Sequence, residues 1–135
     1  MQNNFHNNFQ NPNMDLPIIH KLIEAYKLWQ EHLPHFPKTS RYTLGVKIDD
    51  FFIETTESAY KTCYLKGEKK LSKAEEASLD LDMLKFFLRI AWEIKALDNK
   101  KYAALSKRLD EIGRMLGGWI NYLEEKLPPS AGEQR

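Results

Sequence analysis

The sequence predicts an all-α protein that folds as an antiparallel up-down four-helix bundle. Apolar residues recur at the three- and four-residue spacing of helices throughout residues 16–127, and no segment shows the alternating pattern of a half-buried strand. The same residues include only five glycines and no Asn-Gly or Asp-Gly pair, so the commonest hairpin signals are missing. Four predicted helices of about 17–26 residues, joined by short connectors, would extend about 25–39 Å and match one another in length.

The first two helices are expected over residues 17–33 and 41–65. Pro17 suits a first helical turn, because its missing N–H has no partner there, and Pro34 ends the helix. Gly67 follows the second helix as a residue type that favours helix ends. The apolar stripes of these two helices consist of Ile19, Leu22, Ile23, Tyr26, Trp29 and Leu33, and of Leu44, Ile48, Phe51, Phe52, Thr55 and Ala59.

The last two helices are expected over residues 72–97 and 99–126. Ser72 and Glu75 match the Ser-x-x-Glu capping box that starts many helices. Asp98 suits the N-cap of the final helix, since its carboxylate can accept hydrogen bonds from the first-turn amides. The final helix carries a nearly unbroken apolar stripe of Tyr102, Leu105, Leu109, Ile112, Leu116, Ile120, Leu123 and Leu127.

The second half of the third helix, residues 83–94, is apolar on nearly every face. A helix in a lone bundle needs an apolar surface of only about 100°, so the excess favours a subunit interface on the face turned away from the core. The alternative is a central helix covered on all sides, which a four-helix bundle does not contain. We expect Phe86, Ile90 and Trp92 to lie at such an interface or in close packing.

Gly113, Gly117 and Gly118 are unusual inside a predicted helix, because each glycine there costs about 1 kcal/mol relative to alanine. Gly113 and Gly117 are four residues apart and form a flat strip that another helix, or an indole ring such as that of Trp92 or Trp119, can approach closely. We assign Gly113, Gly117 and Trp119 to close packing or to the oligomer interface. The alternative is a local kink.

Outside the bundle, an Asn- and Gln-rich leader (residues 1–15) and a second tail (residues 128–135) are expected to be disordered. The alternative for the leader is a short segment that docks on a partner through Phe5 and Phe9. One cysteine excludes an internal disulfide, and no apolar run approaches the roughly 18 residues of a membrane span. We therefore expect a cytoplasmic protein with no membrane association.

No constellation of residues supports catalysis or a metal centre. The Glu-x-x-His motif of di-iron bundles does not occur, and neither does a P-loop or a Gly-x-Gly-x-x-Gly loop. Ser58 and Lys61 match Ser-x-x-Lys, but the companion motifs of that enzyme class are missing. We expect no enzyme activity, no cofactor and no metal.

Charge is segregated along the chain although the total is close to neutral. Lys and Arg number 20 against 19 Asp and Glu, and the net charge of +1 argues against a uniformly basic surface. Residues 49–57 and 75–82 each contain four acids and no base, whereas residues 85–108 contain seven bases and two acids. Bases among large apolar side chains suit an RNA backbone or an acidic protein surface. The alternative is a solvated face whose aliphatic stems cover apolar surface.

Three stretches of this sequence resemble a known four-helix-bundle family. They are Phe36–Ile48 (FPKTSRYTLGVKI), Met83–Ile94 (MLKFFLRIAWEI) and Glu111–Ile120 (EIGRMLGGWI). The family contains the accessory variability determinant of diversity-generating retroelements and, more broadly, the 23S rRNA intervening-sequence proteins. The resemblance covers residues 17–125, and its most specific part is the signature Gly113, Arg114, Leu116, Gly117, Trp119 and Ile120.

The resemblance implies a non-catalytic accessory protein that assembles into a ring-like homo-oligomer, a homopentamer. Its implied partners are the retroelement reverse transcriptase and the template RNA, which it holds together to support mutagenic cDNA synthesis. The alternative is a structural oligomer of the 23S rRNA intervening-sequence protein family with no reverse-transcriptase partner. The expected partner- or nucleic-acid-binding residues are Lys85, Arg89 and Arg114, which match basic positions of the family, together with Lys95, Lys100 and Lys101 from the basic stretch.

Overall fold

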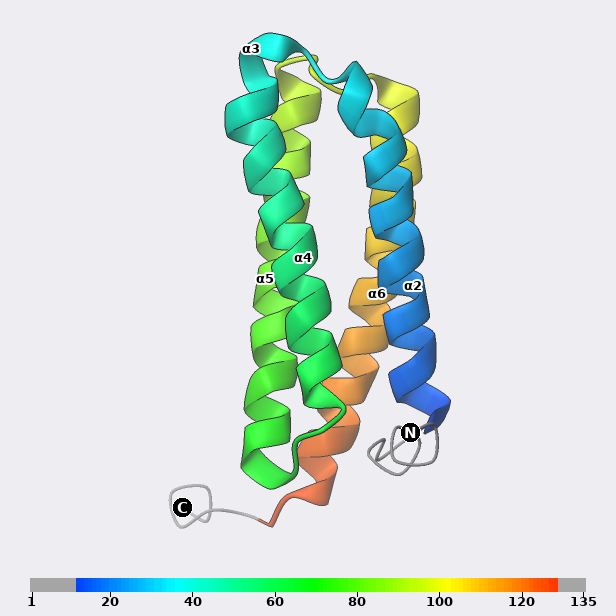
Figure 1. Ribbon diagram of the computed structural model, residues 1–135. Helices are drawn as coiled ribbons and strands as arrows, with labels where there is room; N and C mark the ends of the chain where they lie inside the picture. The colour runs from blue at the N-terminus through cyan, green and yellow to red at the C-terminus, as the bar shows by residue number, and fades with distance from the viewer. Residues whose placement is uncertain (1–11, 129–135) are drawn as a thin grey trace, which may run out of the picture.

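The structure, a computed structural model, describes residues 12–128 and confirms an all-helical bundle (Figure 1). No strand occurs among these residues. Helix α2 begins at Pro12, ahead of the expected Pro17, so it takes in the last residues of the predicted leader. The rest of the leader, with Phe5 and Phe9, and nearly all of the predicted tail lie outside the described residues. The four long helices are α2 (Pro12–His32), α4 (Val46–Thr62), α5 (Gly67–Glu93) and α6 (Asn99–Lys126).

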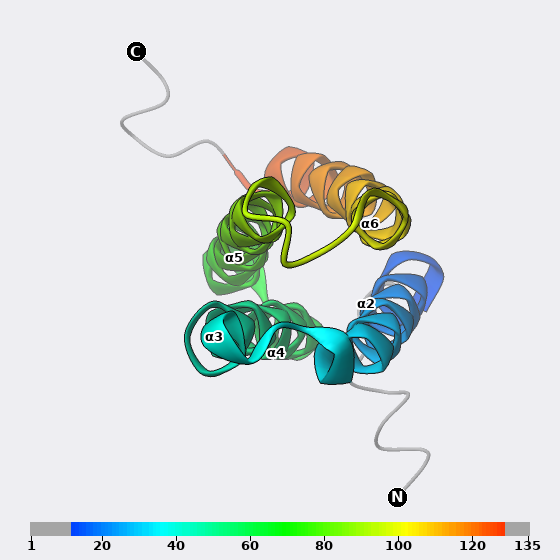
Figure 2. The same cartoon turned by 90° about the horizontal axis from the view of Figure 1, so that it is seen from above.

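Consecutive long helices run antiparallel and form the four corners of the bundle (Figures 1 and 2). Helix α2 packs against α4 and α6, and α5 packs against the same two helices, so α5 lies diagonally opposite α2. Each helix therefore turns one face to a shared core and another face outward. No helix within residues 12–128 is long and apolar enough to cross a membrane.

The core consists of one apolar stripe from each long helix. Trp29 and Phe52 stack with ring centroids 6.0 Å apart, and Phe36, from the connection between α2 and α4, meets Trp29 edge-on at 5.8 Å. The Nε1 of Trp29 donates a hydrogen bond to Asp49 Oδ1 (3.0 Å), which satisfies the polar end of a buried ring. Ile23, which the predicted stripe includes, is 44% exposed instead. The buried apolar residues of α2 are Ile18, Leu22, Ala25 and Trp29.

Short helical turns connect α2 to α4. The Arg41 guanidinium donates to the carbonyl oxygens of Pro34 (2.9 Å) and Phe36 (2.8 Å), which ties this connection together. The second predicted helix therefore divides into a turn and α4, and α4 ends at Thr62 and not at Leu65. The turns are a 3-10 turn (Leu33–His35), α3 (Lys38–Ser40) and a π-helical turn (Arg41–Gly45).

The third long helix begins earlier than the sequence suggests. Helix α5 starts at Gly67, and both Ser72 and Glu75 lie inside it, so the capping-box prediction is wrong. Gly67 has a φ of +60°, a left-handed conformation that glycine adopts without steric cost, and the chain reverses there. The Nζ of Lys70 donates to the carbonyl oxygen of Thr62 at 2.9 Å, which joins the start of α5 to the end of α4.

Helix α5 ends at Glu93, earlier than the expected Leu97, because the chain adopts a left-handed conformation two residues later, at Lys95. Lys95 has a φ of 67° and occupies the position where glycine is usual in a Schellman turn. The backbone amide of Ala96 donates to the carbonyl oxygen of Ala91 (2.8 Å), the six-to-one bond of that motif. The backbone geometry, which the apolar pattern does not reveal, thus stops the helix.

Helix α6 begins as predicted. Asp98 is its N-cap, and its Oδ1 accepts a hydrogen bond from the backbone N–H of Lys101 (2.8 Å). Leu97, directly before the cap, is buried in the core. The turn between α5 and α6 is therefore fixed both by hydrogen bonds and by packing.

Replacing Lys95 with glycine should stabilise the protein. A residue with a Cβ in the left-handed conformation costs about 1–2 kcal/mol, and glycine loses part of that gain through the greater freedom of its unfolded chain. We expect the free energy of unfolding to rise by about 1 kcal/mol, with a Tm about 4 °C higher in thermal denaturation followed by circular dichroism. Lys95→Ala, which removes the charge but keeps a Cβ, is the control. An equal gain from Lys95→Ala would contradict this account.

Candidate functional site

The six basic residues expected at the site lie on α5, on α6 and in the turn between these helices. Because α5 and α6 pack against each other (Figure 2), these residues all come from one pair of neighbouring helices and the turn that joins them. We call this part of the bundle the basic side. Its predicted members are Lys85, Arg89, Lys95, Lys100, Lys101 and Arg114.

Lys85 and Arg89 each have an acidic partner within the chain. The Nζ of Lys85 lies 2.8 Å from Asp110 Oδ1, and this ion pair bridges α5 to α6. The Nε of Arg89 lies 2.7 Å from Glu93 Oε2, one turn further along α5. All four side chains are at least 39% exposed. Exposed pairs contribute only about 0–1 kcal/mol, so an external anion can replace either carboxylate.

Two of the expected residues, together with Lys107, form a row along the outward face of α6. Lys100, Lys107 and Arg114 are spaced by seven residues, about 10.5 Å per step along the axis, and all three are exposed. None of them has an ion pair among residues 12–128. We call these three residues the basic row. Lys107 was not among the expected site residues, although its seven-residue spacing to Lys100 and Arg114 indicates that it belongs with them.

The acids in the middle of α6 turn toward lysines of the neighbouring helices. Asp110 pairs with Lys85 of α5, and Glu111 Oε1 lies 2.7 Å from Lys21 Nζ of α2. The hydrogen bond from Lys21 lowers the pKa of Glu111, so this carboxylate remains ionised on the flank of the helix. Because these carboxylates lie on the flanks of α6, the basic row presents positive charge to solvent.

The positive charge of Lys101 also acts on α2. Burial lowers the pKa of His32 at the end of α2, and the Lys101 ammonium lowers that pKa further. The Nε2 of His32 is buried and has no hydrogen-bond partner among the described residues. The field of the basic side therefore extends across the end of the bundle where α2 meets the start of α6.

An apolar strip runs along the outward face of α5, opposite its core stripe. Leu79 and Phe86 are 62% and 52% exposed. Met83 and Ile90, each four residues further along the helix, are partly buried. Steps of four, three and four residues place these side chains on one face, as in a seam between packed helices. We call these four residues the apolar strip. It contains Phe86 and Ile90, two of the expected interface residues.

Trp92 and Trp119, also expected at an interface or in close packing, both make contacts within the subunit, although Trp92 remains 38% exposed. The ring of Trp92 stacks on Tyr102 with centroids 4.9 Å apart, and its Nε1 donates to Asn99 Oδ1 at 2.7 Å. These contacts brace the turn between α5 and α6. Trp119 is fully buried, so it packs in the core and offers no exposed surface to a second subunit.

The glycines of α6 leave its outer surface open. Helix α6 runs through Gly113, Gly117 and Gly118 without a break. A Cβ added at Gly113 would be in ordinary contact with Leu81 Cδ2 at 3.5 Å, and one added at Gly117 or Gly118 would meet nothing within 4 Å. Packing within the described subunit therefore requires none of these glycines, and a second molecule can approach the backbone closely at Gly117.

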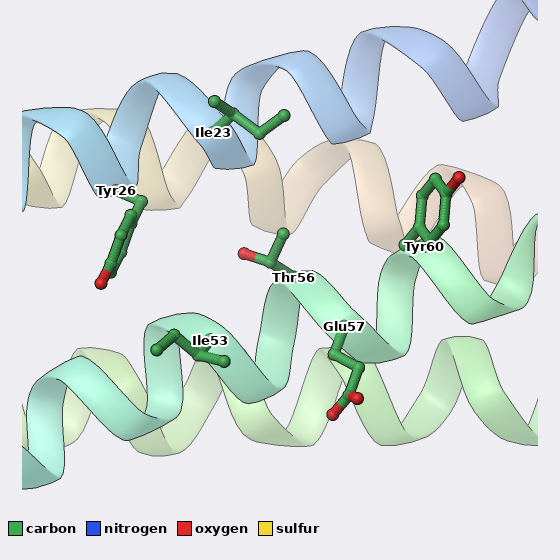
Figure 3. A pocket seen from close by; sticks show the side chains of 6 residues that line it. All are labelled: Ile23, Tyr26, Ile53, Thr56, Glu57 and Tyr60. Carbon is green, nitrogen blue, oxygen red and sulfur yellow. The ribbon is translucent and has the colours of Figure 1, made fainter.

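An apolar groove of about 370 Å³ lies between α2 and α4 (Figure 3). Ile23 of α2 and Ile53 of α4 are 44% and 49% exposed on its walls. The sequence pattern did not predict this groove. Its one signal was Ile53, an apolar residue outside the predicted core stripe of its helix. The groove is lined by Ile23, Tyr26, Ile53, Thr56, Glu57 and Tyr60.

These features differ from a catalytic or metal centre in their chemistry. Within residues 12–128 no group of three or more His, Cys, Asp or Glu side chains could hold a metal ion, and Cys63 is buried. The basic row suits an anionic partner. The apolar strip and the apolar groove suit apolar partners.

Replacing Lys101 with glutamine should raise the pKa of His32, because an imidazole is protonated more easily once a nearby positive charge is removed. The measurement is an NMR titration of the histidine Cε1–H signals, with His32 assigned from His32→Gln. Since folding lowers the pKa of His32 below 6.5, stability falls as the pH drops through and below this value, and Lys101→Gln should weaken that loss. Lys61→Gln on α4 is the control, and an identical His32 titration in both variants would refute the effect.

A comparison with protein families matches residues 18–123 to the family described as bAvd-like. Among the residues whose burial the structure describes, the match runs from Ile18 of α2 to Leu123 of α6, and it contains all the buried apolar residues between them. No curated protein and no solved structure matches the chain. Because the family match spans most of the chain and all four long helices, the protein belongs to the bAvd-like family.

Proposed function

We propose that this protein is a non-catalytic accessory protein of a diversity-generating retroelement and that it binds the reverse transcriptase of that element. Membership of the bAvd-like family supports this function. The observation that carries it is the basic row, three outward cations in line on α6 with no ion pair among the described residues. An acidic surface of the enzyme complements such a row. The protein acts in the cytoplasm, and the chemistry of cDNA synthesis belongs to the reverse transcriptase.

Template RNA is the second partner in this proposal. Lys and Arg side chains bind phosphate oxygens whatever the base sequence, and the binding weakens steeply with salt. The basic row spans about 21 Å of α6, and Lys85 and Arg89 can exchange their exposed carboxylate partners for phosphates. With a net charge of only +1, one subunit holds RNA weakly, whereas several subunits side by side hold it more tightly.

The subunits assemble, in the same proposal, into a closed ring. The apolar strip lies on α5 and the apolar groove lies between α2 and α4. Because α5 is diagonally opposite α2 (Figure 2), the outward face of α5 and the groove are on different sides of the bundle. Packing the strip of one subunit into the groove of the next is a heterologous contact, which closes into a ring when the rotation permits. The helical spacing of the strip fits a groove between two helices. The number of five subunits follows from the family resemblance.

A structural oligomer related to the 23S rRNA intervening-sequence proteins, with no reverse-transcriptase partner, is the second candidate. The apolar strip and the apolar groove favour it, because they account for assembly without an enzyme. A genomic neighbourhood that holds no reverse transcriptase gene would support this candidate over the first.

Charge reversal in the basic row should abolish co-purification with the reverse transcriptase. In Lys107→Glu/Arg114→Glu, two outward cations become repulsive to an acidic partner, and we expect recovery of the enzyme to fall at least about tenfold, as when close charge pairs at an interface are broken. The measurement is an affinity pull-down, at fixed salt, from cells that co-express both proteins.

The matched control for this pull-down is Lys27→Glu/Lys61→Glu. It makes the same change of charge at exposed residues of α2 and α4 and should retain the enzyme. Circular dichroism melting establishes that both variants fold. Equal recovery by the two variants, or no recovery by the wild type, would contradict the proposed association.

Charges placed in the apolar strip should dissociate the oligomer. We expect Leu79→Asp/Phe86→Asp to have a mass near 15.9 kDa by light scattering at micromolar concentration, where the wild type has a multiple of it, because burying an unpaired carboxylate is strongly unfavourable. Ile53→Asp should act alike if the strip packs into the groove. Tyr42→Asp, at a residue that is 75% exposed and outside both surfaces, should keep the oligomer. A monomeric wild type would overturn the proposed ring.

A further inference from the structure

A second basic feature lies at the other end of the bundle, where α5 begins and α6 ends (Figure 1). It is a cavity of about 240 Å³, several times the roughly 30 Å³ of a water molecule. No acidic side chain lines it, although Glu68 is in the first turn of α5. We call it the basic cavity. Its wall contains Lys66, Gly67, Lys70, Trp119, Tyr122 and Lys126.

Two of the three lysines lie against aromatic rings of the wall. The Nζ of Lys70 is 5.5 Å from the ring centroid of Trp119, and the Nζ of Lys126 is 5.2 Å from that of Tyr122. Lys70 is 96% buried and donates to the carbonyl oxygen of Thr62 at 2.9 Å, so its ammonium is held in place. A positive charge in such a water-poor place interacts strongly with an anion that enters the cavity.

The wall of the basic cavity also offers neutral donors from the backbone. The ring of Trp119 packs beneath the wall, fully buried, and its Nε1 has no surface exposed to a ligand. The cavity also borders the start of α5, where no side chain caps the helix and the first backbone amides have no partner within it. Gly67 leaves this backbone uncovered, since nothing lies within 4 Å of the place its Cβ would take. Donors therefore dominate the wall, and a ligand rich in acceptors fits it.

We propose that the basic cavity binds a phosphate group. A phosphate supplies several acceptor oxygens and a negative charge for the ammonium groups and for the amides at the start of α5. The source is either a small phosphomonoester or the backbone of a nucleic acid. The second source rests on the proposed function, in which template RNA lies along the basic row of α6, the helix whose end borders the cavity.

The test is an NMR titration of the Trp119 indole N–H signal, assigned by elimination with Trp29→Phe and Trp92→Phe. The full chain is titrated at constant ionic strength with inorganic phosphate, with adenosine monophosphate and with a short oligouridylate, and with chloride for comparison. We expect a saturable shift with each phosphate compound and none with chloride. Tighter binding of the monophosphate identifies a phosphomonoester site, and tighter binding of the oligouridylate identifies a backbone site.

Lys66→Gln/Lys126→Gln should weaken the binding at least tenfold, because it removes two exposed cations from the wall of the cavity. The matched control is Lys27→Gln/Lys61→Gln, which makes the same change of charge on α2 and α4 and should bind as the wild type does. The absence of a saturable shift with all three compounds, or equal binding by both variants, would overturn the proposal. No reverse transcriptase is present in this titration, so its result is independent of the pull-down that tests the proposed function.

Discussion

The packing of one apolar stripe from each helix around a shared core decides what the bundle presents to solvent. Helix α6 buries Leu105, Leu109 and Leu116, and this orientation holds the basic row outward and in line. Helix α5 has two apolar faces, and the core takes only one of them. The second face, with Leu79 and Phe86, remains at the surface. The surfaces that suit partners are therefore consequences of the core.

Ion pairs between helices separate the charges further. Lys85 and Lys21 engage the two acids in the middle of α6, so the carboxylates face sideways and the cations of the basic row face outward. A chain with a net charge of +1 thereby acquires a positive side without an excess of lysine and arginine. In a ring, this side is repeated once per subunit, and the attraction to a polyanion grows by multivalency while each subunit stays near neutral.

Helix α6 links the two basic regions of the molecule. Lys95 lies in the turn before α6, and Lys101 lies in its first turn. The basic row follows along its outer face, and Lys126 at its end lines the basic cavity. Its 28 residues extend about 42 Å. A left-handed backbone conformation lies near each end, at Lys95 before α6 and at Gly67 across the basic cavity from its end. The turns of the bundle thus shape the places where partners and ligands are proposed to bind.

Sequence periodicity by itself determined the helical class, the four long helices and most of the core, because a stripe at helical spacing can be buried in only one orientation. The N-cap at Asp98 was equally readable, since it depends on one local hydrogen bond. Tertiary structure decided the rest. The capping box at Ser72 is not used, because the chain already reverses at Gly67 and α5 begins there. The hydrogen bond from Lys70 to Thr62, a contact between α5 and α4, holds this earlier start in place. Likewise the groove beside Ile53 and the cavity beside Trp119 form where two helices meet, so the pattern of one helix could at most single out Ile53 and could not place the helix opposite it.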